Sequence, residues 1–201
     1  MPTHDADSRL ILASASPRRR ELLAAAGYAF EVRPADIDET LPAESAAAGE
    51  VARRLALEKA RAVAAAEPAE GRWVIGADTI VVLGRRIIGK PRDAADAVAI
   101  LRDLSGSRHA VITGLALVQT GSLRSYVREA VTWIRMRPIP EDEIRSYVTS
   151  GGSHGTAGAY AIQEGGDRFV ESTEGSFSNI VGLPMELLAE MLGEVGYCPK
   201  R

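Results

Sequence analysis

The segment that most constrains the fold runs from Trp73 to Leu83, an almost continuous apolar run with one acidic residue, Asp78, in its middle. A run of this length that is rich in Val and Ile predicts a buried β-strand. A buried carboxylate needs a cationic partner or a metal ion, and Gly76 permits a bulge or a close backbone approach at the same place. We therefore expect Asp78 to belong to a functional site, with a structural hydrogen bond to a loop as the alternative.

The other segments alternate between helix and strand patterns. Ser16 can cap a helix that begins at Pro17, Gly27 suits the left-handed end of that helix, and Asp93 can cap a later one. Crossovers mixed with hairpins predict an α/β protein with a mixed β-sheet. We expect strands at 9–13, 30–34, 73–83, 86–89, 109–119 and 123–136, and helices at 18–26, 45–67, 94–106, 140–150 and 184–192.

Composition places the chain in the range of one globular domain. It has 201 residues, of which 46% are hydrophobic and 25% charged, which is enough to bury a core. We expect residues 1–8 to be a disordered extension and residues 9–195 to form a single α/β domain with two lobes. The net charge of -3 excludes the strongly basic footprint of a non-specific nucleic-acid binder, so any anion site must be local.

Cysteine content and hydropathy indicate a protein of a reducing compartment. The single cysteine, Cys198, excludes an internal disulfide and a cysteine-based zinc site. The polar stretch 1–8 contains Asp5 and Asp7 and lacks the basic start and apolar centre of a secretory signal. No apolar run approaches the roughly 18 residues of a membrane span. We therefore expect a cytoplasmic protein.

Three consecutive arginines, Arg18, Arg19 and Arg20, occupy the first turn of a predicted helix. The helix dipole disfavours cations there by about 0.3 to 1 kcal/mol each. A bound phosphate would compensate, because backbone N–H groups, the dipole and the guanidinium groups would all point at one anion. The alternative is that these side chains extend into solvent or pair with Glu21.

Lys59 lies near the middle of the apolar face of the predicted helix at 45–67, whereas Arg53, Arg54 and Arg61 lie on the opposite face. Lysine is almost never fully buried without a partner. Lys59 must therefore meet an acid or point into a polar cleft. A structural ion pair is the alternative to a functional role.

Glu39 in an acidic loop and Lys90 at the end of a strand complete the charged candidates. Two carboxylates and several cations are what metal-assisted attack on a polyphosphate requires. The acids would hold magnesium or activate water, and the cations would take up phosphate charge. The set as a whole therefore points to phosphate chemistry, although each residue alone is unremarkable.

Other residues give weaker signals. No Gly-x-x-x-x-Gly-Lys-Ser/Thr phosphate loop is present, and Ser14 and Ser16 lack the histidine and aspartate order of a catalytic triad. We expect Trp73 and Trp133 to belong to the core. The histidines are too dispersed in the sequence for a metal triad: His4, His109 and His154.

Five sequence words in one order resemble the Maf family of nucleotide pyrophosphatases. They are Leu12-Ala13-Ser14-Ala15-Ser16-Pro17-Arg18-Arg19, Gly76-Ala77-Asp78-Thr79, Gly89-Lys90-Pro91-Arg92-Asp93, Ala157-Gly158-Ala159-Tyr160-Ala161-Ile162-Gln163, and Gly175-Ser176 with Val181-Gly182-Leu183-Pro184. The match is collinear from about Arg9 to Leu192 and so covers nearly the whole chain. Five ordered words are far more specific than any one of them.

The resemblance implies an elongated, two-lobed α/β fold with a mixed β-sheet, flanking helices and a central cleft, related to the inosine triphosphate pyrophosphatases. It implies hydrolysis of a nucleoside triphosphate to the monophosphate and pyrophosphate, with a divalent metal, Mg or Mn, as cofactor. It also implies that the protein binds a nucleoside triphosphate as its substrate and forms a homodimer, with neither a nucleic-acid polymer nor a membrane as a partner.

Position by position, the resemblance implies roles for the matching residues. Asp78 matches the proton acceptor that activates water, and with Glu39 it matches the acids that hold the metal. Ser14 and Ser16 match supporting positions. The cationic positions around the triphosphate are matched by Arg18, Arg19, Lys59 and Lys90. The positions that influence substrate choice are matched by Arg18, Thr79 and Gln163.

Within the family, the Ala-Tyr-x-Ile-Gln word resembles the branch that acts on dTTP and UTP. We expect Gln163 to follow a strand-like segment at 159–162 and to pair with the edge of a uracil or thymine ring. Relatives usually carry Lys just before the Ala-Gly word, where this chain has Thr156, so one cation of the usual set is missing. The alternatives are a 7-methyl-GTP pyrophosphatase and a mainly non-catalytic regulator of septum formation. A binder of the latter kind has no need of a buried Asp78.

Overall fold

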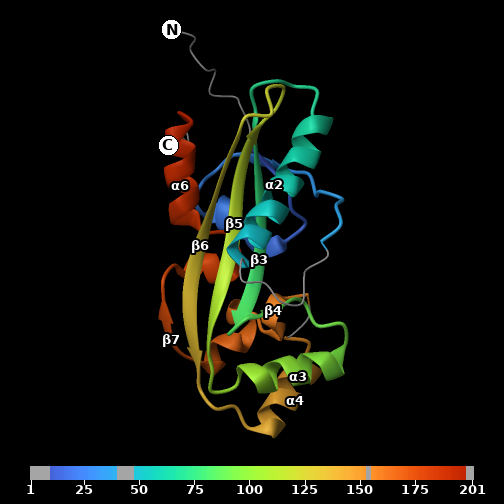
Figure 1. Ribbon diagram of the computed structural model, residues 1–201, viewed down its shortest axis with the longest axis vertical. Coiled ribbons are helices and arrows are strands. Elements are labelled where there is room, and N and C mark those ends of the chain that lie inside the picture. The colour runs from blue at the N-terminus through green and yellow to red at the C-terminus, as the bar shows by residue number, and fades with distance from the viewer. Residues whose placement is uncertain (1–9, 40–47, 153–154, 198–201) are drawn as a thin grey trace.

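A computed structural model describes residues 10–39, 48–152 and 155–197 and shows an elongated α/β protein (Figure 1). Its sheet has seven strands in the order β2-β1-β3-β5-β6-β7, with β4 paired to β3 outside this path. β1 is parallel to β2 and β3, whereas the other pairs are antiparallel, so the sheet is mixed as predicted. The strands are β1 (Leu10–Leu12), β2 (Phe30–Val32), β3 (Trp73–Leu83), β4 (Arg86–Ile88), β5 (Arg108–Gln119), β6 (Ser125–Met136) and β7 (Val170–Glu174).

Helices cover both faces of the sheet. Residues of β1, β3 and β5 alternate between two apolar clusters, one packed on α2 and the other on α1 and α6. Helices α3 and α4 pack together at the lower end in Figure 1. The helices are α1 (Pro17–Ala25), α2 (Ala48–Ala66), α3 (Ala94–Leu104), α4 (Glu141–Thr149), α5 (Phe177–Val181) and α6 (Met185–Glu194), with the short turns η1 (Ala157–Ala159), η2 (Ile162–Gly166) and η3 (Asp167–Phe169).

The long strands β3, β5 and β6 join two apolar cores at opposite ends of the molecule (Figure 1). The upper core includes Leu23, Ile75 and Leu117, packed against α1 and α6. The lower core includes Leu101 and Tyr147, from α3 and α4. The middle of β3 therefore passes from one core to the other.

Two glycines bring α2 close to the sheet. A Cβ atom on Gly76 would lie 2.1 Å from the backbone oxygen of Ala56, and one on Gly114 would lie 2.2 Å from backbone atoms of Ala52. The predicted close approach at Gly76 is confirmed, and the register of β3 with β5 continues through it without a bulge. This approach brings the face of α2 that carries Lys59 onto the centre of β3.

The predicted element order agrees with the structure up to α4, and the region after α4 differs from it. The expected strand-like segment at 159–162 is reduced to Tyr160 and Ala161, which are extended, because Ala159 with a φ angle of 57° ends one short helical turn and Ile162 begins the next. Strand β7 and helix α5 had not been predicted.

Trp133 is 39% exposed on β6, so its assignment to the core is wrong. The expected extension at 1–8, the start of the helix at 45–47, and His4, His154 and Cys198 lie outside the described residues.

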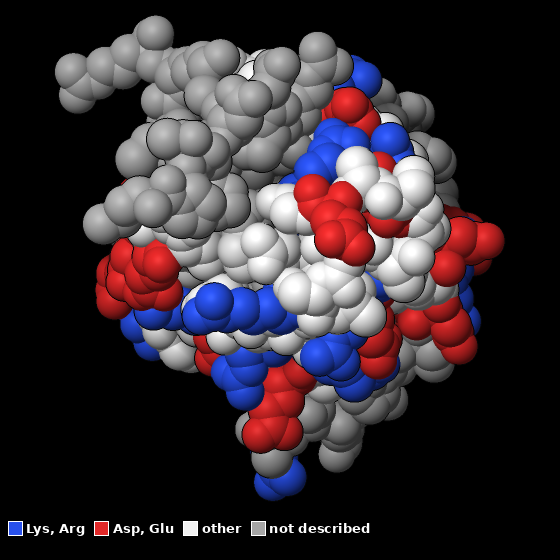
Figure 2. Space-filling view, turned by 90° about the horizontal axis from the view of Figure 1, so that it is seen from above, with Lys and Arg blue, Asp and Glu red and all other residues white. Residues whose placement is uncertain are grey.

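The described surface carries mixed charge. Seen from above, basic and acidic side chains are interspersed, without a broad area of one sign among the coloured atoms (Figure 2). Among the helices that the structure describes, none is long and apolar enough to cross a membrane.

Candidate active site

A pocket of about 550 Å³ opens at the centre of β3, where the two cores meet. Ala77 belongs to the upper core and Val81 to the lower, and Asp78 and Thr79 lie between them. The fold therefore brings together candidates that are far apart in the sequence. All ten predicted site residues line this pocket: Ser14, Ser16, Arg18, Arg19, Glu39, Lys59, Asp78, Thr79, Lys90 and Gln163.

The loop between β1 and α1 forms one wall. Ser16 caps α1 by accepting from the Arg19 backbone N–H at 3.5 Å, and Pro17 is the first helical residue, as predicted. Ser14 Oγ accepts from the Ser16 backbone N–H at 3.2 Å, so the two serines shape this loop. The three arginines then differ in exposure: Arg19 is buried, Arg18 is half-buried and Arg20 is exposed.

Arg19 is the centre of a buried hydrogen-bond network. Its Nε donates to Gly182 O at 2.8 Å, Nη1 to Ser14 Oγ at 3.0 Å and Ala77 O at 2.9 Å, and Nη2 to Thr79 Oγ1 at 3.1 Å. A guanidinium carries five N–H donors, so these bonds leave at most one for a ligand. Burial lowers the pKa of Arg19, although the carboxylates nearby oppose the shift. Arg19 therefore joins three segments of the chain and has little donor capacity left for phosphate.

Lys59 links the two acidic candidates. Its Nζ donates to Asp78 Oδ1 at 2.7 Å and lies 2.9 Å from Glu39 Oε1. Lys59 and Asp78 are each 6% exposed, so both charges are buried and compensate one another. The predicted inward direction of Lys59 is confirmed, and the structure shows that its partners are the two carboxylates.

Glu39 stands at the open side of this group. Burial alone would raise the pKa of Glu39, but the hydrogen bond and charge of Lys59, with the charges of Lys90 and Arg19, hold it below its usual value. Lys90 Nζ lies 4.0 Å from Glu39 Oε2, and 64% of the Lys90 side chain is exposed. Lys90 is therefore a long cation at the mouth of the pocket, able to turn toward a ligand.

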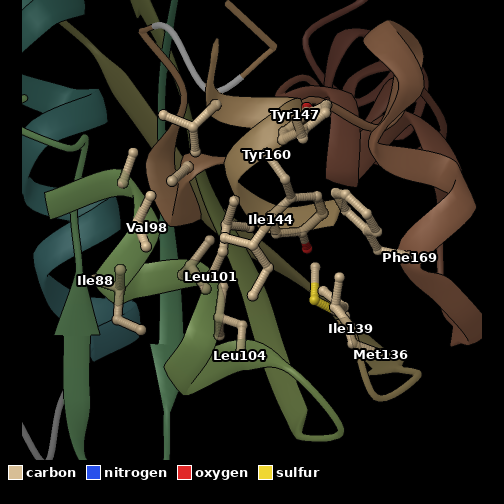
Figure 3. Packing of buried hydrophobic residues seen from close by; sticks show 14 of the residues in the cluster. Ile88, Val98, Leu101, Leu104, Met136, Ile139, Ile144, Tyr147, Tyr160 and Phe169 are labelled. Carbon is tan, nitrogen blue, oxygen red and sulfur yellow. The ribbon is translucent and has the colours of Figure 1, made fainter. Parts of the chain in front are cut away.

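The opposite wall is neutral. It consists of the segment from Thr156 to Gln163, of which Thr156 and Tyr160 are buried and Gln163 is exposed at the pocket. Figure 3 shows Tyr160 among the apolar side chains of the lower core, near Ile144 and Phe169. The position where relatives usually carry lysine holds Thr156, so no cation stands at that point of the wall.

Several polar residues of the site had not been singled out from the sequence. Thr113 Oγ1 bonds with Thr79 Oγ1 at 2.9 Å and donates to Asn179 O at 3.2 Å. Asn179 Nδ2 donates to Val111 O at 3.1 Å. The available signal was a polar side chain within an apolar run, the same signal that identified Asp78. It is weaker here because Thr and Asn carry no charge and are buried at lower cost.

Comparison with known proteins agrees with this geometry. The family model described as Maf-like protein matches residues 9–195. The chain belongs to the Maf family. A protein of Geobacter sulfurreducens is 48% identical over 189 residues, which cover 94% of this chain and 97% of the relative. A protein of Syntrophotalea carbinolica is 45% identical over 193 residues, which cover 96% of this chain and 87% of the relative. Both are named dTTP/UTP pyrophosphatase.

The donor set of this Maf-family site suits a hard divalent cation. Mg²⁺ is commonly held by one or two carboxylates, with substrate phosphate oxygens and water as the remaining ligands. Glu39 and Asp78 provide two carboxylates that both reach the same ammonium group. No cluster of three or more His, Cys, Asp or Glu side chains that could hold a metal occurs within the described ranges. In the part of the chain that the structure describes, Glu39 and Asp78 are therefore the pocket residues whose carboxylate oxygens could contact a metal ion.

Proposed function

We propose that this protein hydrolyses dTTP and UTP between the α- and β-phosphates, releasing the nucleoside monophosphate and pyrophosphate. The observation that carries the proposal is the buried Asp78, which is bonded to Lys59 at the centre of the pocket. Two further cations, Arg18 and Lys90, line the same pocket. Relatives at 44–48% identity that are named dTTP/UTP pyrophosphatase support the choice of substrate. These two cations can neutralise part of the negative charge of a bound triphosphate.

Asp78 is the proposed general base. Oδ1 is held by Lys59, and among the described residues Oδ2 makes no hydrogen bond, so it can accept a proton from water. The water oxygen then bonds to the α-phosphorus. The bond from that phosphorus to the oxygen bridging to the β-phosphorus breaks, and pyrophosphate leaves with the electron pair. Lys59 orients the carboxylate during this step, while Arg18 and Lys90 bind phosphate oxygens.

Glu39 and Asp78 are the proposed holders of a Mg²⁺ or Mn²⁺ ion. When bound, such an ion would add positive charge where the leaving pyrophosphate develops negative charge. Lys59 already bridges the two carboxylates, so it keeps them close together in the absence of the ion. Hydrolysis is therefore expected to require a divalent metal ion.

Gln163 is the proposed reader of the base, with Arg18 and Thr79 as the other residues that influence substrate choice. Gln163 is exposed at the neutral wall and offers one acceptor and two donors, which suits the alternating edge of uracil or thymine. A carboxylate in its place could only accept. Thr79 Oγ1 is bonded within the Arg19 network, so it can act on the substrate through that network as well as by direct contact.

We further propose that the protein is a cytoplasmic homodimer. Val131 and Trp133 are 41% and 39% exposed on β6, and Phe177 of α5 is 55% exposed. Large apolar side chains exposed on the surface can contribute to interfaces between subunits. Light scattering during gel filtration would measure the mass in solution, and a monomer at micromolar concentration would contradict this part of the proposal.

The deciding experiment is identification of the products by ion-exchange chromatography. Purified protein with Mg²⁺ or Mn²⁺ should convert UTP and dTTP to monophosphate and pyrophosphate, and EDTA should stop the reaction. Diphosphate and orthophosphate would instead place the attack at the γ-phosphorus and contradict the mechanism. Preference for 7-methyl-GTP would favour the other branch of the family, and absence of any hydrolysis would favour a non-catalytic regulator.

A further inference from the structure

Three hydrogen bonds hold the neutral wall of the pocket against the lower core. The Gly158 backbone N–H donates to Gly89 O at 3.1 Å, next to Lys90. The Ala161 backbone N–H donates to the Tyr147 hydroxyl oxygen at 3.0 Å. The hydroxyl group of Tyr160 bonds with His109 Nε2 at 2.9 Å. Two of these three bonds therefore involve a buried tyrosine hydroxyl, and they hold residues 160 and 161, just before Gln163.

The bond between Tyr160 and His109 has a preferred direction. His109 is fully buried on β5, and burial lowers its pKa to about 4, so the imidazole is neutral near pH 7. A neutral imidazole has one donor and one acceptor nitrogen. Among the described residues His109 Nε2 is the only partner of the Tyr160 hydroxyl, and Ser107 Oγ lies 3.4 Å from Nδ1. Both rings are satisfied if Tyr160 donates to Nε2 and Nδ1–H points to Ser107.

The hydroxyl of Tyr160 is not required for apolar packing. Phe169 and Ile144 fill the same core without polar groups, and the Tyr160 ring packs edge-on against His109 with centroids 5.8 Å apart. A buried hydroxyl and a buried imidazole each cost free energy unless they are paired. Apolar contacts alone could hold the wall in place, and the hydrogen bond between Tyr160 and His109 additionally fixes the orientation of the Tyr160 ring. Tyr160 also lines the pocket, so any displacement of its ring changes the shape of the site.

We propose that His109 is a positioning residue for substrate recognition: through Tyr160 it fixes the wall that presents Gln163 to the base. The inference rests on the proposed function of the pocket and adds a residue that no sequence word contains. Among the described residues, the hydrogen-bond partners of the His109 side chain are Ser107 and Tyr160, and neither belongs to the charged wall. Its loss should therefore weaken binding and base discrimination while turnover at saturation, which depends on Asp78 and Lys59, stays nearly the same.

Kinetics of two single variants test this separation of KM from kcat. Tyr160→Phe and His109→Leu should each raise the KM for UTP roughly five- to thirtyfold, the range expected when a buried partner is left unpaired, with kcat within about twofold. His109→Gln keeps an acceptor near the position of Nε2 and should restore most of the affinity. Tyr126→Phe is the matched control, because Tyr126 packs on Trp73 in the upper core and does not line the pocket.

Two further measurements separate this inference from the proposed function and from a purely structural role. Calorimetric binding of a UTP analogue that cannot be hydrolysed should weaken in Tyr160→Phe and His109→Leu, whether or not the wild type hydrolyses UTP. Nitrogen NMR of the wild type should show Nε2 of His109 unprotonated, with a changed shift in Tyr160→Phe. Lower melting temperatures with unchanged KM and analogue affinity would assign the pair to stability alone and overturn the inference.

Discussion

The two walls of the pocket are built from opposite kinds of interaction. On one wall, Arg19, Lys59 and Asp78 are charged and buried, and they are bonded to one another or to backbone oxygens. On the other wall, Tyr160 and His109 are buried and neutral. A wall of compensated charges can move a proton and, through the neighbouring Arg18 and Lys90, bind phosphate, whereas a neutral wall can offer only shape and hydrogen-bond pattern. Under the proposed function, the charged wall performs the chemistry and the neutral wall presents Gln163 to the base.

The charged wall is organised before any ligand binds. Lys59 holds both carboxylates, and four hydrogen bonds orient Arg19, so neither group must rearrange at the moment of reaction. The neutral wall is held by hydrogen bonds between uncharged groups. This difference predicts that variants of the two walls will have different kinetic signatures.

The largest effect is expected for Asp78→Asn, which keeps the shape of the side chain and removes the proposed base. Turnover should fall by roughly 10²- to 10⁴-fold, the range of general acid–base catalysis, while thermal unfolding stays cooperative. Steady-state pyrophosphate release measures the loss. Asp103→Asn, at an exposed position paired with Arg86, is the matched control and should keep wild-type turnover. Near-normal activity in a folded Asp78→Asn protein would exclude Asp78 as the base.

Removal of the Arg19 network should act mainly on stability. Arg19→Ala leaves buried acceptors of three chain segments without a donor and should reduce the free energy of unfolding by about 3 to 5 kcal/mol. Urea titration provides this value. Arg20→Ala, one residue later on the exposed side of α1, should change it by less than about 0.5 kcal/mol. Equal stability losses at the two positions would show that the network does not join the segments.

The neutral histidine predicts a pH dependence of stability. The pKa of His109 is about 4 in the folded protein because of burial and about 6.5 in the unfolded chain, so between these values the unfolded chain binds more protons. Stability is therefore highest above pH 6.5 and falls as the pH drops toward 4. The loss due to this group is about 3 kcal/mol.

His109→Gln removes the titrating group and provides the comparison. Urea unfolding between pH 4 and 7 should show a flatter profile for the variant by that amount, since the carboxylates contribute equally to both proteins. Parallel profiles would mean that His109 titrates normally in the folded state. This would also contradict its assignment as a neutral anchor of the wall.

The smallest effect is expected for Gln163→Glu, which exchanges a group with donors for one that only accepts. The ratio of kcat/KM for UTP to that for 7-methyl-GTP should fall by a factor equivalent to about 1 to 3 kcal/mol, the scale of hydrogen-bonded base readout. Gln119→Glu, outside the pocket, is the control. An unchanged ratio would mean that Gln163 does not read the base and that pocket size selects the substrate.

Much of the fold follows from local sequence patterns. The alternation of apolar runs and the caps at Ser16 and Asp93 act over a few residues, so they predict elements without tertiary contacts. Lys59 and Asp78 could be recognised for a similar reason. A charge inside an apolar pattern is costly wherever the chain folds, and only a partner or a ligand can compensate for it.

The tertiary structure decided what those residues contact and what forms after α4. Arg18 and Arg19 are equivalent in the sequence, yet only Arg19 is buried, because Gly182 and Ala77 bring backbone oxygens to its guanidinium group. Likewise β7 lies beside β6, and the chain turns at Gly158 and Ala159 just before the extended residues Tyr160 and Ala161, although their own sequences specify neither. Hydrogen bonds between distant segments depend on the packing of the whole sheet and its helices, and no local pattern contains that information.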